Sequence, residues 1–462
     1  PGLQYHFLGD SATYAVGEME QVIPFSGHFS AEVIRRIAGT AKHSYVLLIT
    51  QDTMIRFGEH AMERWVSVAE DTGAVMVYAD YYAVEEERRS PYPVIDYQPG
   101  SLRDDFNFGP ALLIRTEALK QVASKMQDSR FAGLYALRLG LSRMGEIFHL
   151  QEYLYDAVSL DRRTTGKKIF DYVDPKNREV QVEMEQEVTR HLKAIGGYLA
   201  PDFRDVAFNE GTFPVEATVV IPVRNRVKTI GDAIASVMKQ EARFSYNLIV
   251  VDNHSSDGTT EVIRSYADKH GNLIHIQPER LDLGIGGCWN RAVNDARCGR
   301  FSVQLDSDDI YLDEHTLQRI IDQFHEEKCA MVIGAYTMTN FDLEEIPPGK
   351  IDHREWTPDN GRNNALRING LGAPRAFYTP VLRKHKLPNV NYGEDYGVGL
   401  AISRYYRIGR IYDPLYLCRR WEDNTDASLD VQTMNRHNYY KDQLRTIELK
   451  ARIQMNRSSS KT

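Results

Sequence analysis

Three carboxylates stand at the end of one apolar segment. Residues 301–305 read Phe-Ser-Val-Gln-Leu, with apolar side chains at alternate positions, and Asp306, Asp308 and Asp309 follow at once. This alternation predicts a buried strand that ends at the acidic cluster. Carboxylates held so close repel one another unless a counter-charge is present. Hard oxygen ligands without thiolate or imidazole favour Mg²⁺ or Mn²⁺, and such a cation would in turn neutralise an anion such as a diphosphate.

Simpler explanations of this cluster are a solvated turn and a helix cap, both of which are common uses of Asp. A calcium-binding EF-hand loop is excluded, because it needs Gly at its sixth position and Glu at its twelfth. Counted from Asp306, those positions hold Tyr311 and Leu317. The motifs that accompany the cluster therefore carry the argument.

The segment that leads to the cluster alternates strand and helix patterns. Its apolar runs at 218–221, 247–251, 273–276 and 301–305 are separated by stretches with helical spacing. Alternation with continuous Val and Ile runs predicts a mainly parallel sheet covered by helices on both faces. In such sheets ligands bind at the carboxyl ends of the strands, which is where this chain places its polar residues.

Polar residues follow the first two runs directly. Pro222, Val223, Arg224 and Asn225 come after the first run, and Asp252 closes the second. A carboxylate at a strand end can accept hydrogen bonds from a uracil imide or from ribose hydroxyls. We therefore expect Asp252 to contact a ligand.

The next loop and the next turn add two charged candidates. Asp257 has two equally good explanations, a helix cap and a ligand contact. Arg280 precedes the glycine-rich stretch 284–287, where it can face phosphate. That stretch resembles a dinucleotide fingerprint only superficially, because the third glycine would fall on Trp289. Hydride transfer is therefore disfavoured.

Two charged pairs lie further along the chain. Glu394 and Asp395 open a predicted helix, where acids also favour the helix dipole. Arg419 and Arg420 are two guanidinium groups that can grip a diphosphate or form an ordinary surface pair.

The order of these motifs resembles that of the family 2 glycosyltransferases of the GT-A fold, over roughly residues 215–425. Those enzymes share a nucleotide-binding first half, an Asp-x-Asp motif at the end of a central strand and a later Glu-Asp pair. The resemblance implies that Asp308 and Asp306 bind the metal ion and that Asp395 is the catalytic base, with Glu394 beside it. The residues that it implies for the nucleotide sugar are Pro222, Val223, Arg224, Asn225, Asp252, Asp257, Arg280, Asp306, Ser307, Arg419 and Arg420.

The acceptor side is the least marked part of the sequence. Gly372 and Arg375 lie between the metal and base motifs, and Trp421 follows the two arginines, so we expect these three residues to face the acceptor. Processive members of the family carry Gln-x-x-Arg-Trp, but Leu417 stands at the Gln position here. A processive polymerase is therefore not expected.

The first part of the chain repeats the second at one constant offset. Its single carboxylate at the matching strand end is Asp52, and Leu134 and Tyr135 replace the Glu-Asp pair. We infer a degenerate internal duplication whose first copy has lost the chemistry. The matching pairs are Glu59 with Glu314, His60 with His315, Arg64 with Arg319 and Met76 with Met331.

A chain of 462 residues is too long for one hydrophobic core. We divide it into a degenerate, inactive GT-A-like domain (1–165), a linker and packing helix (166–213), a catalytic domain (214–430) and a C-terminal helix and tail (431–462). The predicted class is α/β: a Rossmann-like GT-A domain preceded by a partial degenerate copy.

Composition narrows the functional classes. A net charge of −8 argues against nucleic-acid binding, which needs a basic surface. No apolar run reaches the ~18 residues of a membrane span, and no signal-peptide pattern opens the sequence. The four cysteines lack metal-binding spacing, which indicates free thiols in a reducing compartment. We expect a cytoplasmic protein, and contact with the inner face of a membrane is compatible with this.

The sequence therefore predicts an inverting glycosyltransferase that uses Mn²⁺ or Mg²⁺. We expect it to transfer a sugar from a nucleotide-diphosphate donor to a hydroxyl of a saccharide or glycolipid in glycan biosynthesis. The resemblance to the family favours UDP as the nucleotide. A sugar-nucleotide nucleotidylyltransferase should carry a Gly-rich basic loop after the first strand, but residues 223–228 contain no Gly. A non-catalytic carbohydrate-binding protein is the other alternative, although the second copy retains its acids.

Overall fold

The computed structural model describes residues 6–9, 21–24, 29–51, 53–85, 88–159, 178–354, 356–421 and 429–459. The chain forms two compact units, of which the first comprises residues 1–198 and 430–462 and the second residues 199–429. Asp52 and residues 160–177, which include the start of the predicted linker segment (166–213), lie outside the described residues, as do residues 422–428.

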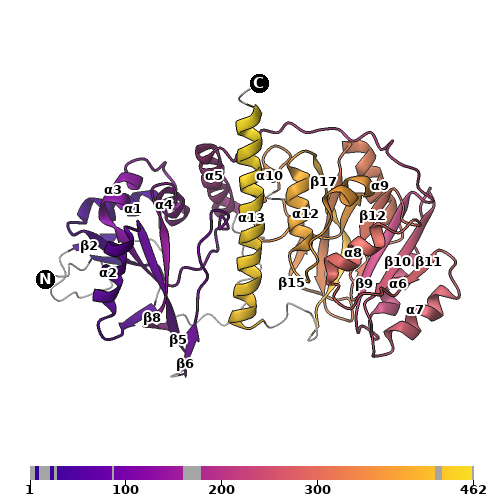
Figure 1. Cartoon of the computed structure of the whole chain (residues 1–462), viewed down its shortest axis with the longest axis horizontal. Helices are drawn as coiled ribbons and strands as arrows, with labels where there is room; N and C mark the ends of the chain where they lie inside the picture. Colours follow the sequence, from indigo (N-terminus) through magenta and orange to yellow (C-terminus); the bar gives the residue numbers. More distant parts are fainter. Residues whose placement is uncertain are drawn as a thin grey trace. The chain divides into compact units, whose positions relative to one another are not determined.

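A nine-stranded sheet forms the centre of the second unit (Figure 1). The strands run in the order β11-β10-β9-β12-β16-β14-β17-β13, and β15 pairs with β14. Strands β11, β10, β9 and β12 are parallel to one another, whereas β16 is antiparallel to both β12 and β14. This confirms the predicted α/β class. The strands are β9 (Ala217–Val223), β10 (Tyr246–Asp252), β11 (Leu273–Ile276), β12 (Phe301–Gln304), β13 (Ile310–Tyr311), β14 (Met331–Thr339), β15 (Glu345–Ile351), β16 (Arg375–Tyr378) and β17 (Ile408–Arg419).

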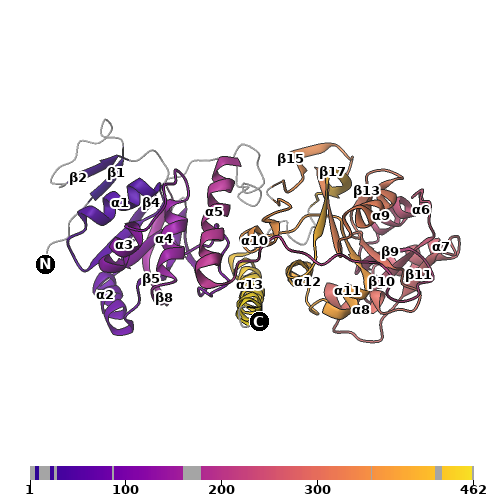
Figure 2. The same cartoon turned by 90° about the horizontal axis from the view of Figure 1, so that it is seen from above.

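Helices cover both faces of this sheet, with α6 and α9 on one side and α8, α11 and α12 on the other (Figure 2). Ile230, Ala233, Ile234 and Val237 of α6 are fully buried, at the spacing of one helical face. Consecutive residues of β9 are also fully buried, because the strand is covered on both sides. The helices are α6 (Ile230–Met238), α7 (Thr259–Ala267), α8 (Ile285–Val293), α9 (Thr316–Glu327), α10 (Gly361–Asn364), α11 (Thr379–His385) and α12 (Glu394–Ser403).

The first unit has a six-stranded sheet in the order β3-β7-β5-β8-β4, with β6 paired to β5. A separate parallel pair is formed by β1 (His6–Gly9) and β2 (Gln21–Pro24). The strands of the main sheet are β3 (Tyr45–Ile49), β4 (Thr53–Phe57), β5 (Met76–Glu85), β6 (Arg88–Tyr92), β7 (Ala111–Arg115) and β8 (Ile147–Ser159). The helices are α1 (Ala31–Thr40), α2 (Ala61–Thr72), α3 (Thr116–Ala123), α4 (Gly133–Leu141), α5 (Arg178–Ile195) and α13 (Val431–Ser459).

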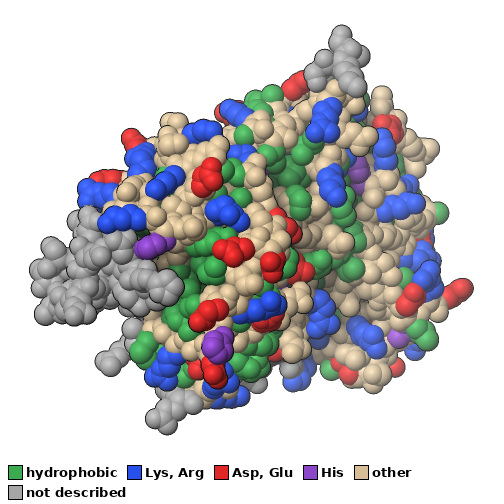
Figure 3. All heavy atoms as spheres, turned by 60° about the vertical axis from the view of Figure 1, so that its left-hand side comes forward, with side chains coloured by type: hydrophobic (Ala, Val, Ile, Leu, Met, Phe, Trp, Pro, Cys, Tyr) green, Lys and Arg blue, Asp and Glu red, His purple; other side chains and the backbone are tan. Residues whose placement is uncertain are grey.

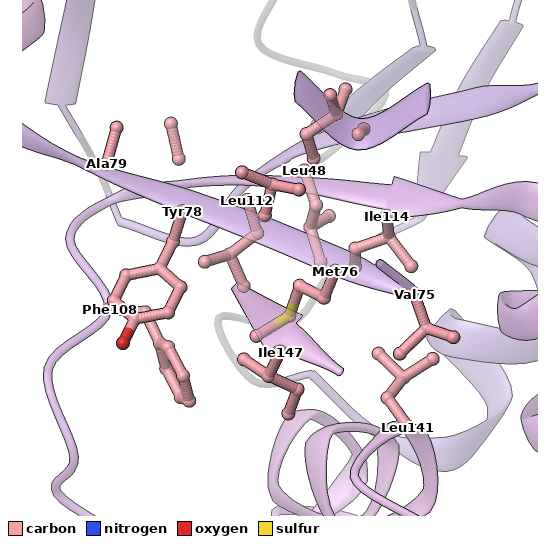
Figure 4. Packing of buried hydrophobic residues seen from close by; sticks show 14 of the residues in the cluster. Leu48, Val75, Met76, Tyr78, Ala79, Phe108, Leu112, Ile114, Leu141 and Ile147 are labelled. Carbon is pink, nitrogen blue, oxygen red and sulfur yellow. The ribbon is translucent and has the colours of Figure 1, made fainter. Parts of the chain in front are cut away.

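The core of the first unit lies between this sheet and its helices. Met76, Leu112, Ile114 and Ile147 from three adjacent strands pack together, and Leu141 of α4 closes one side (Figure 4). All five are buried. The first unit therefore has a hydrophobic core of its own, formed by apolar residues of its strands and helices.

Two helices that we had assigned to separate segments belong to the first unit. The side chain of Asn456 in α13 donates a hydrogen bond to the carbonyl of Gly196, just after α5, at 2.8 Å. In α13, Asp442 and Arg445 are fully buried and form an ion pair of 2.8 Å. Asp442 also accepts the hydroxyl of Ser101 at 2.9 Å. The first compact unit thus runs to Tyr198 and also contains residues 430–462.

Surface and helix composition add two general facts. On the face in Figure 3, basic and acidic side chains are interspersed with hydrophobic ones rather than gathered by sign. Within the described ranges, none of the helices combines the length and the apolar composition that a bilayer crossing needs.

Candidate active site

The acidic cluster follows β12 at the carboxyl edge of the sheet, as the sequence predicted. Asp306 Oδ1 accepts a hydrogen bond from Gln304 Nε2 at 2.8 Å, and Oδ2 accepts the hydroxyl of Tyr416 at 3.0 Å. Gln304 ends β12 and Tyr416 lies on β17. Two strands of the sheet therefore fix the first carboxylate of the cluster.

The other two carboxylates are held in a less favourable charge environment. Asp309 is buried and accepts the backbone N–H of Arg419 at 2.8 Å. Burial and then the neighbouring acids raise the pKa of Asp309. Burial, followed by the charge of Asp306, raises the pKa of Asp308, and the guanidinium of Arg226 opposes this at 3.9 Å. The neighbouring acids therefore repel one another, and a bound cation would relieve this repulsion.

The donor set suits a hard cation that shares its coordination with a ligand. Among the described residues, no group of three His, Cys, Asp or Glu side chains is arranged to hold a metal ion. Asp306 and Asp308 offer two carboxylates, and Mg²⁺ is commonly bound by one or two carboxylates together with substrate phosphates and water. The residues present therefore fit a metal that binds together with a diphosphate.

The predicted base stands at the start of α12. Gly393, at φ 81°, turns the chain into this helix, and Glu394 and Asp395 are its first two residues. Asp395 Oδ2 lies 2.5 Å from Nη1 of Arg375, which is the first residue of β16. Burial and then the charge of Asp395 raise the pKa of Glu394 to about 8. Glu394 is therefore mostly protonated at neutral pH.

Arg375 connects the two groups of acids. Burial lowers its pKa, but the charges of Asp395, Asp306 and Glu394 raise it more. Its backbone N–H also donates to Gln304 Oε1 at 3.1 Å, and the same Gln304 side chain contacts Asp306. The metal-side acid and the predicted base thus meet around one arginine.

Asp252 ends β10, as predicted, but points inward. Its side chain is fully buried. It accepts hydrogen bonds from Ser255 N–H at 3.0 Å and from Thr260 Oγ1 at 2.5 Å, and His275 Nε2 lies 3.5 Å away. Burial raises the pKa of Asp252, but these hydrogen bonds lower it by more. The pKa of Asp252 is therefore below its ordinary value. A contact of Asp252 with the nucleotide stays a prediction.

The loop after β9 is tied to the start of α7. Asp257, which precedes the N-cap Gly258, accepts the N–H groups of Thr259 at 3.0 Å and Val227 at 3.1 Å. Asn225 Oδ1 accepts the N–H of Ser256 at 2.8 Å. These contacts hold two loops of the carboxyl edge together. The other predicted residues of the first loop are Val223, which is buried, Pro222, which is half-buried, and Arg224, which is exposed.

Two predicted phosphate ligands have partners within the chain. Arg280 is exposed and forms an ion pair of 2.5 Å with Asp282. Arg419 is buried, its Nη1 lies 2.8 Å from Asp232, and its Nε donates to the carbonyl of Asp308 at 2.6 Å. Arg419 therefore holds the loop of residues 306–309 in place.

The remaining predicted residues lie around the same loop. Ser307 accepts the hydroxyl of Thr229 through its carbonyl at 2.9 Å. Arg420 donates its backbone N–H to Thr339 at 2.8 Å. The indole N–H of Trp421 lies 3.5 Å from Asp308 Oδ2, so this residue stands beside the metal-side acid. The carbonyl of Gly372 accepts a hydrogen bond from Arg375 Nη1 at 3.0 Å, which places it beside the base.

The glycines of the stretch 284–287 have a packing role. A Cβ on Gly286 would lie 1.8 Å from the carbonyl oxygen of Pro388, and one on Gly284 would lie 2.7 Å from Val390. Only glycine therefore lets the start of α8 approach the segment that precedes α12. This approach brings together two segments that are far apart in the sequence.

Sequence reasoning missed four side chains of this site. Gln304 and Tyr416 hold Asp306, Asp232 pairs with Arg419, and Arg226 faces Asp308. The one available signal was Gln304, a polar residue inside an apolar strand.

Residues 218–385 match the family model described as "Glycosyl transferase family 2". The "Poly(ribitol-phosphate) beta-glucosyltransferase" of Bacillus spizizenii is 24% identical over 215 residues, which are 45% of this chain and 33% of that protein. The "Minor teichoic acid biosynthesis protein GgaB" of Bacillus subtilis is 25% identical over 233 residues, 47% of this chain and 24% of that protein. The chain thus spans a third or less of these relatives.

Two solved structures are also similar. The crystal structure of S. aureus TarS 1-349 in complex with UDP is 22% identical, covers 50% of this chain and 65% of its own, and has a TM-score of 0.39. The mannosyltransferase PcManGT from Pyrobaculum calidifontis, in complex with GDP-Man and Mn²⁺, is 15% identical. It covers 62% of this chain and 85% of its own, with a TM-score of 0.37. Similarities of this size do not assign a substrate.

Proposed function

Residues 218–385 belong to glycosyl transferase family 2, and from this premise we propose that the chain is an inverting, metal-dependent glycosyltransferase. It transfers a sugar from a nucleotide-diphosphate donor to a hydroxyl of a saccharide acceptor, at the carboxyl edge of the nine-stranded sheet. UDP is the nucleotide that we propose. The observation that carries this proposal is the meeting of Asp306 and Asp395 around Arg375.

The proposed chemistry is a single displacement. The carboxylate of Asp395 accepts the proton of the acceptor hydroxyl while that oxygen attacks the anomeric carbon of the donor sugar. A bond forms between this carbon and the acceptor oxygen, and the bond to the nucleoside diphosphate breaks. The electron pair of the broken bond leaves with the diphosphate. Attack opposite the leaving group inverts the anomeric configuration.

The acidic cluster serves the leaving group in this proposal. Asp308 and Asp306 would hold Mn²⁺ or Mg²⁺, which stabilises the charge that develops on a departing diphosphate. Arg226, 3.9 Å from Asp308, adds a positive charge at the same edge. Arg419 keeps Asp308 and Asp309 in place through their backbone and side-chain oxygens. Donor binding therefore uses the acids, and these two arginines orient the acids.

We also propose that the first unit is a degenerate copy of the later half of the second. The order β3-β7-β5-β8-β4 matches β12-β16-β14-β17-β13, and the extra strands β6 and β15 pair with β5 and β14. Registers agree as well. Met76 pairs with Ile114 on β7 and Ile147 on β8, as Met331 pairs with Phe377 on β16 and Ile408 on β17.

A pair of tyrosines supports the same relationship. Tyr155 is opposite Tyr81 in the first sheet, and Tyr416 is opposite Tyr336 in the second. The hydroxyl of Tyr416 contacts Asp306, whereas the buried hydroxyl of Tyr155 has no partner in the described part of the chain. The first unit therefore keeps the tyrosine at this position, but its hydroxyl is not bonded to a carboxylate in the described residues.

The first unit also lacks an acidic pair at the helix that corresponds to α12. Helix α4 begins at Gly133, and Leu134 and Tyr135 follow it. Tyr135 is buried and donates its hydroxyl to the carbonyl of Leu102. These contacts support an inactive first unit.

The free cysteines support a reducing compartment, and we propose the cytoplasm. Cys288, Cys298 and Cys329 are buried, Cys418 is half-buried, and all four are unpaired by disulfides.

Nucleotide release, measured with and without Mn²⁺ across UDP-, GDP- and CDP-linked sugars, tests the proposal. A glycosyltransferase releases the nucleoside diphosphate when an acceptor saccharide is present, and it does so only with the metal. A nucleotidylyltransferase instead consumes a nucleoside triphosphate and a sugar phosphate and releases pyrophosphate. Binding of saccharide without release of any nucleotide would favour the carbohydrate-binding alternative. Either of these outcomes would overturn the proposal.

A further inference from the structure

We propose that Arg375 is a positioning residue that fixes Asp395 by one carboxylate oxygen and leaves the other oxygen for the acceptor. This inference rests on the proposed function of Asp395 as the base. Arg375 Nη1 lies 2.5 Å from Oδ2 of Asp395. Within the described residues, Oδ1 of Asp395 receives no hydrogen bond, and the side chain is 21% exposed. One oxygen is thus engaged and the other is open.

A second contact fixes the position of the Arg375 guanidinium. The same Nη1 donates to the carbonyl of Gly372 at 3.0 Å, and the side chain is only 18% exposed. Gly372 has a φ of 99°, and a Cβ there would lie 2.8 Å from the ring of His353, so glycine is required. The guanidinium therefore has a fixed location from which it can orient a carboxylate.

The backbone of Arg375 connects the base to the acidic cluster. Its N–H donates to Gln304 Oε1 at 3.1 Å, and Gln304 Nε2 donates to Asp306 Oδ1 at 2.8 Å. A donor bound at Asp306 and an acceptor activated by Asp395 would therefore be positioned by the same hydrogen-bonded residues. This explains why a half-buried arginine stands next to the proposed base.

The geometry separates the effect of Arg375 from donor binding. Its side chain contacts Asp395 and Gly372, whereas its link to Gln304 runs through the backbone and survives substitution. Arg375→Met keeps the apolar stem but lets the Asp395 carboxylate turn. A misplacement of about 1 Å can cost on the order of 10²-fold in rate. We expect kcat to fall by about this factor while the Kd for UDP with Mn²⁺ stays within about twofold.

Arg375→Lys is the conservative variant. The 2.5 Å contact joins Nη1 of Arg375 to Asp395, and one ammonium group can replace a contact of this kind. We expect Arg375→Lys to recover most of the lost kcat, and free guanidinium to restore part of the activity of Arg375→Ala. A residue with a merely structural role would show neither rescue. Arg243→Met is the matched control, because Arg243 is 81% exposed and pairs with the exposed Asp322.

The experiment measures kcat, acceptor KM and UDP affinity for the full chain and these variants. An active wild type with an equally active Arg375→Met variant would overturn this inference and leave the proposed function intact. A wild type that transfers no sugar from any donor would overturn both. If Arg375→Met does not fold, Arg375→Lys decides: a folded Lys variant as inactive as Asp395→Asn would overturn the inference.

Discussion

The hydroxyl of Tyr416 donates a hydrogen bond to Oδ2 of Asp306 at 3.0 Å. Tyr155 has the matching place in the first unit, but its hydroxyl is buried without a partner in the described part of the chain. Burying a hydroxyl without a hydrogen bond is unfavourable, whereas burying one that is bonded to a carboxylate is not. The two tyrosines therefore differ in what their hydroxyls contribute to stability.

We expect opposite effects when each hydroxyl is removed. Tyr416→Phe removes a hydrogen bond to a carboxylate and should lower the free energy of unfolding by ~1.5 kcal/mol or more. Tyr155→Phe removes an unsatisfied polar atom and should leave stability unchanged or raise it. Calorimetric melting of the full chain measures both effects. A larger loss of stability for Tyr155→Phe than for Tyr416→Phe would contradict the interpretation.

Asp308→Asn should have two opposite consequences. Without metal, it removes a half-buried charge that Asp306 and Asp309 repel, so the melting temperature in EDTA should rise. With Mn²⁺ and UDP, it removes a ligand, so the stabilisation by the ligand pair should be lost. Titration calorimetry and melting curves measure the two. Asp322→Asn, at an exposed helical site, is the control. Unchanged UDP affinity in Asp308→Asn would refute the metal assignment.

The sequence predicted the parts of the site that local patterns determine. The strand period placed the acids after β12, and the pattern after residue 390 placed Glu394 and Asp395 at the start of α12. The constant offset between Met76 and Met331 likewise depends only on chain positions. Each of these features is encoded within a short segment, so periodicity and spacing are enough to find it.

Contacts between distant segments could not be predicted in this way. We expected Asp252 to contact a ligand, but sequence spacing did not indicate that Thr260 and His275, from two other elements, would hold its carboxylate. We expected Arg419 to bind a diphosphate, but sequence spacing did not indicate that Asp232, 187 positions away in the sequence, would pair with its guanidinium. Sequence spacing contains no information about which partner a charged side chain meets after folding. The structure supplies that partner.

Asp395→Asn should abolish proton acceptance without disturbing the donor. The amide has nearly the same shape as the carboxylate but cannot take the acceptor proton, and a general base contributes ~10²–10⁴-fold. We expect transfer to fall by at least the lower factor while UDP affinity in Mn²⁺ is retained. Glu394→Gln is the matched neighbour. Its carboxyl is already protonated at neutral pH because burial raises its pKa to about 8, so transfer should be largely retained. Equal losses in both variants would contradict the assignment of the base.

The stability of the protein should also depend on pH through Glu394. Its pKa is raised from an ordinary 4.5 to about 8 in the folded chain, because burial and the charge of Asp395 disfavour the ionised form. Between these values the folded state binds a proton that the unfolded state has lost, so stability falls as pH rises through this window. Glu394→Gln cannot titrate. The melting temperature of this variant, relative to wild type, should therefore increase from about pH 5 to about pH 8. A constant difference between the two proteins across this range would show that Glu394 is not protonated in the folded state.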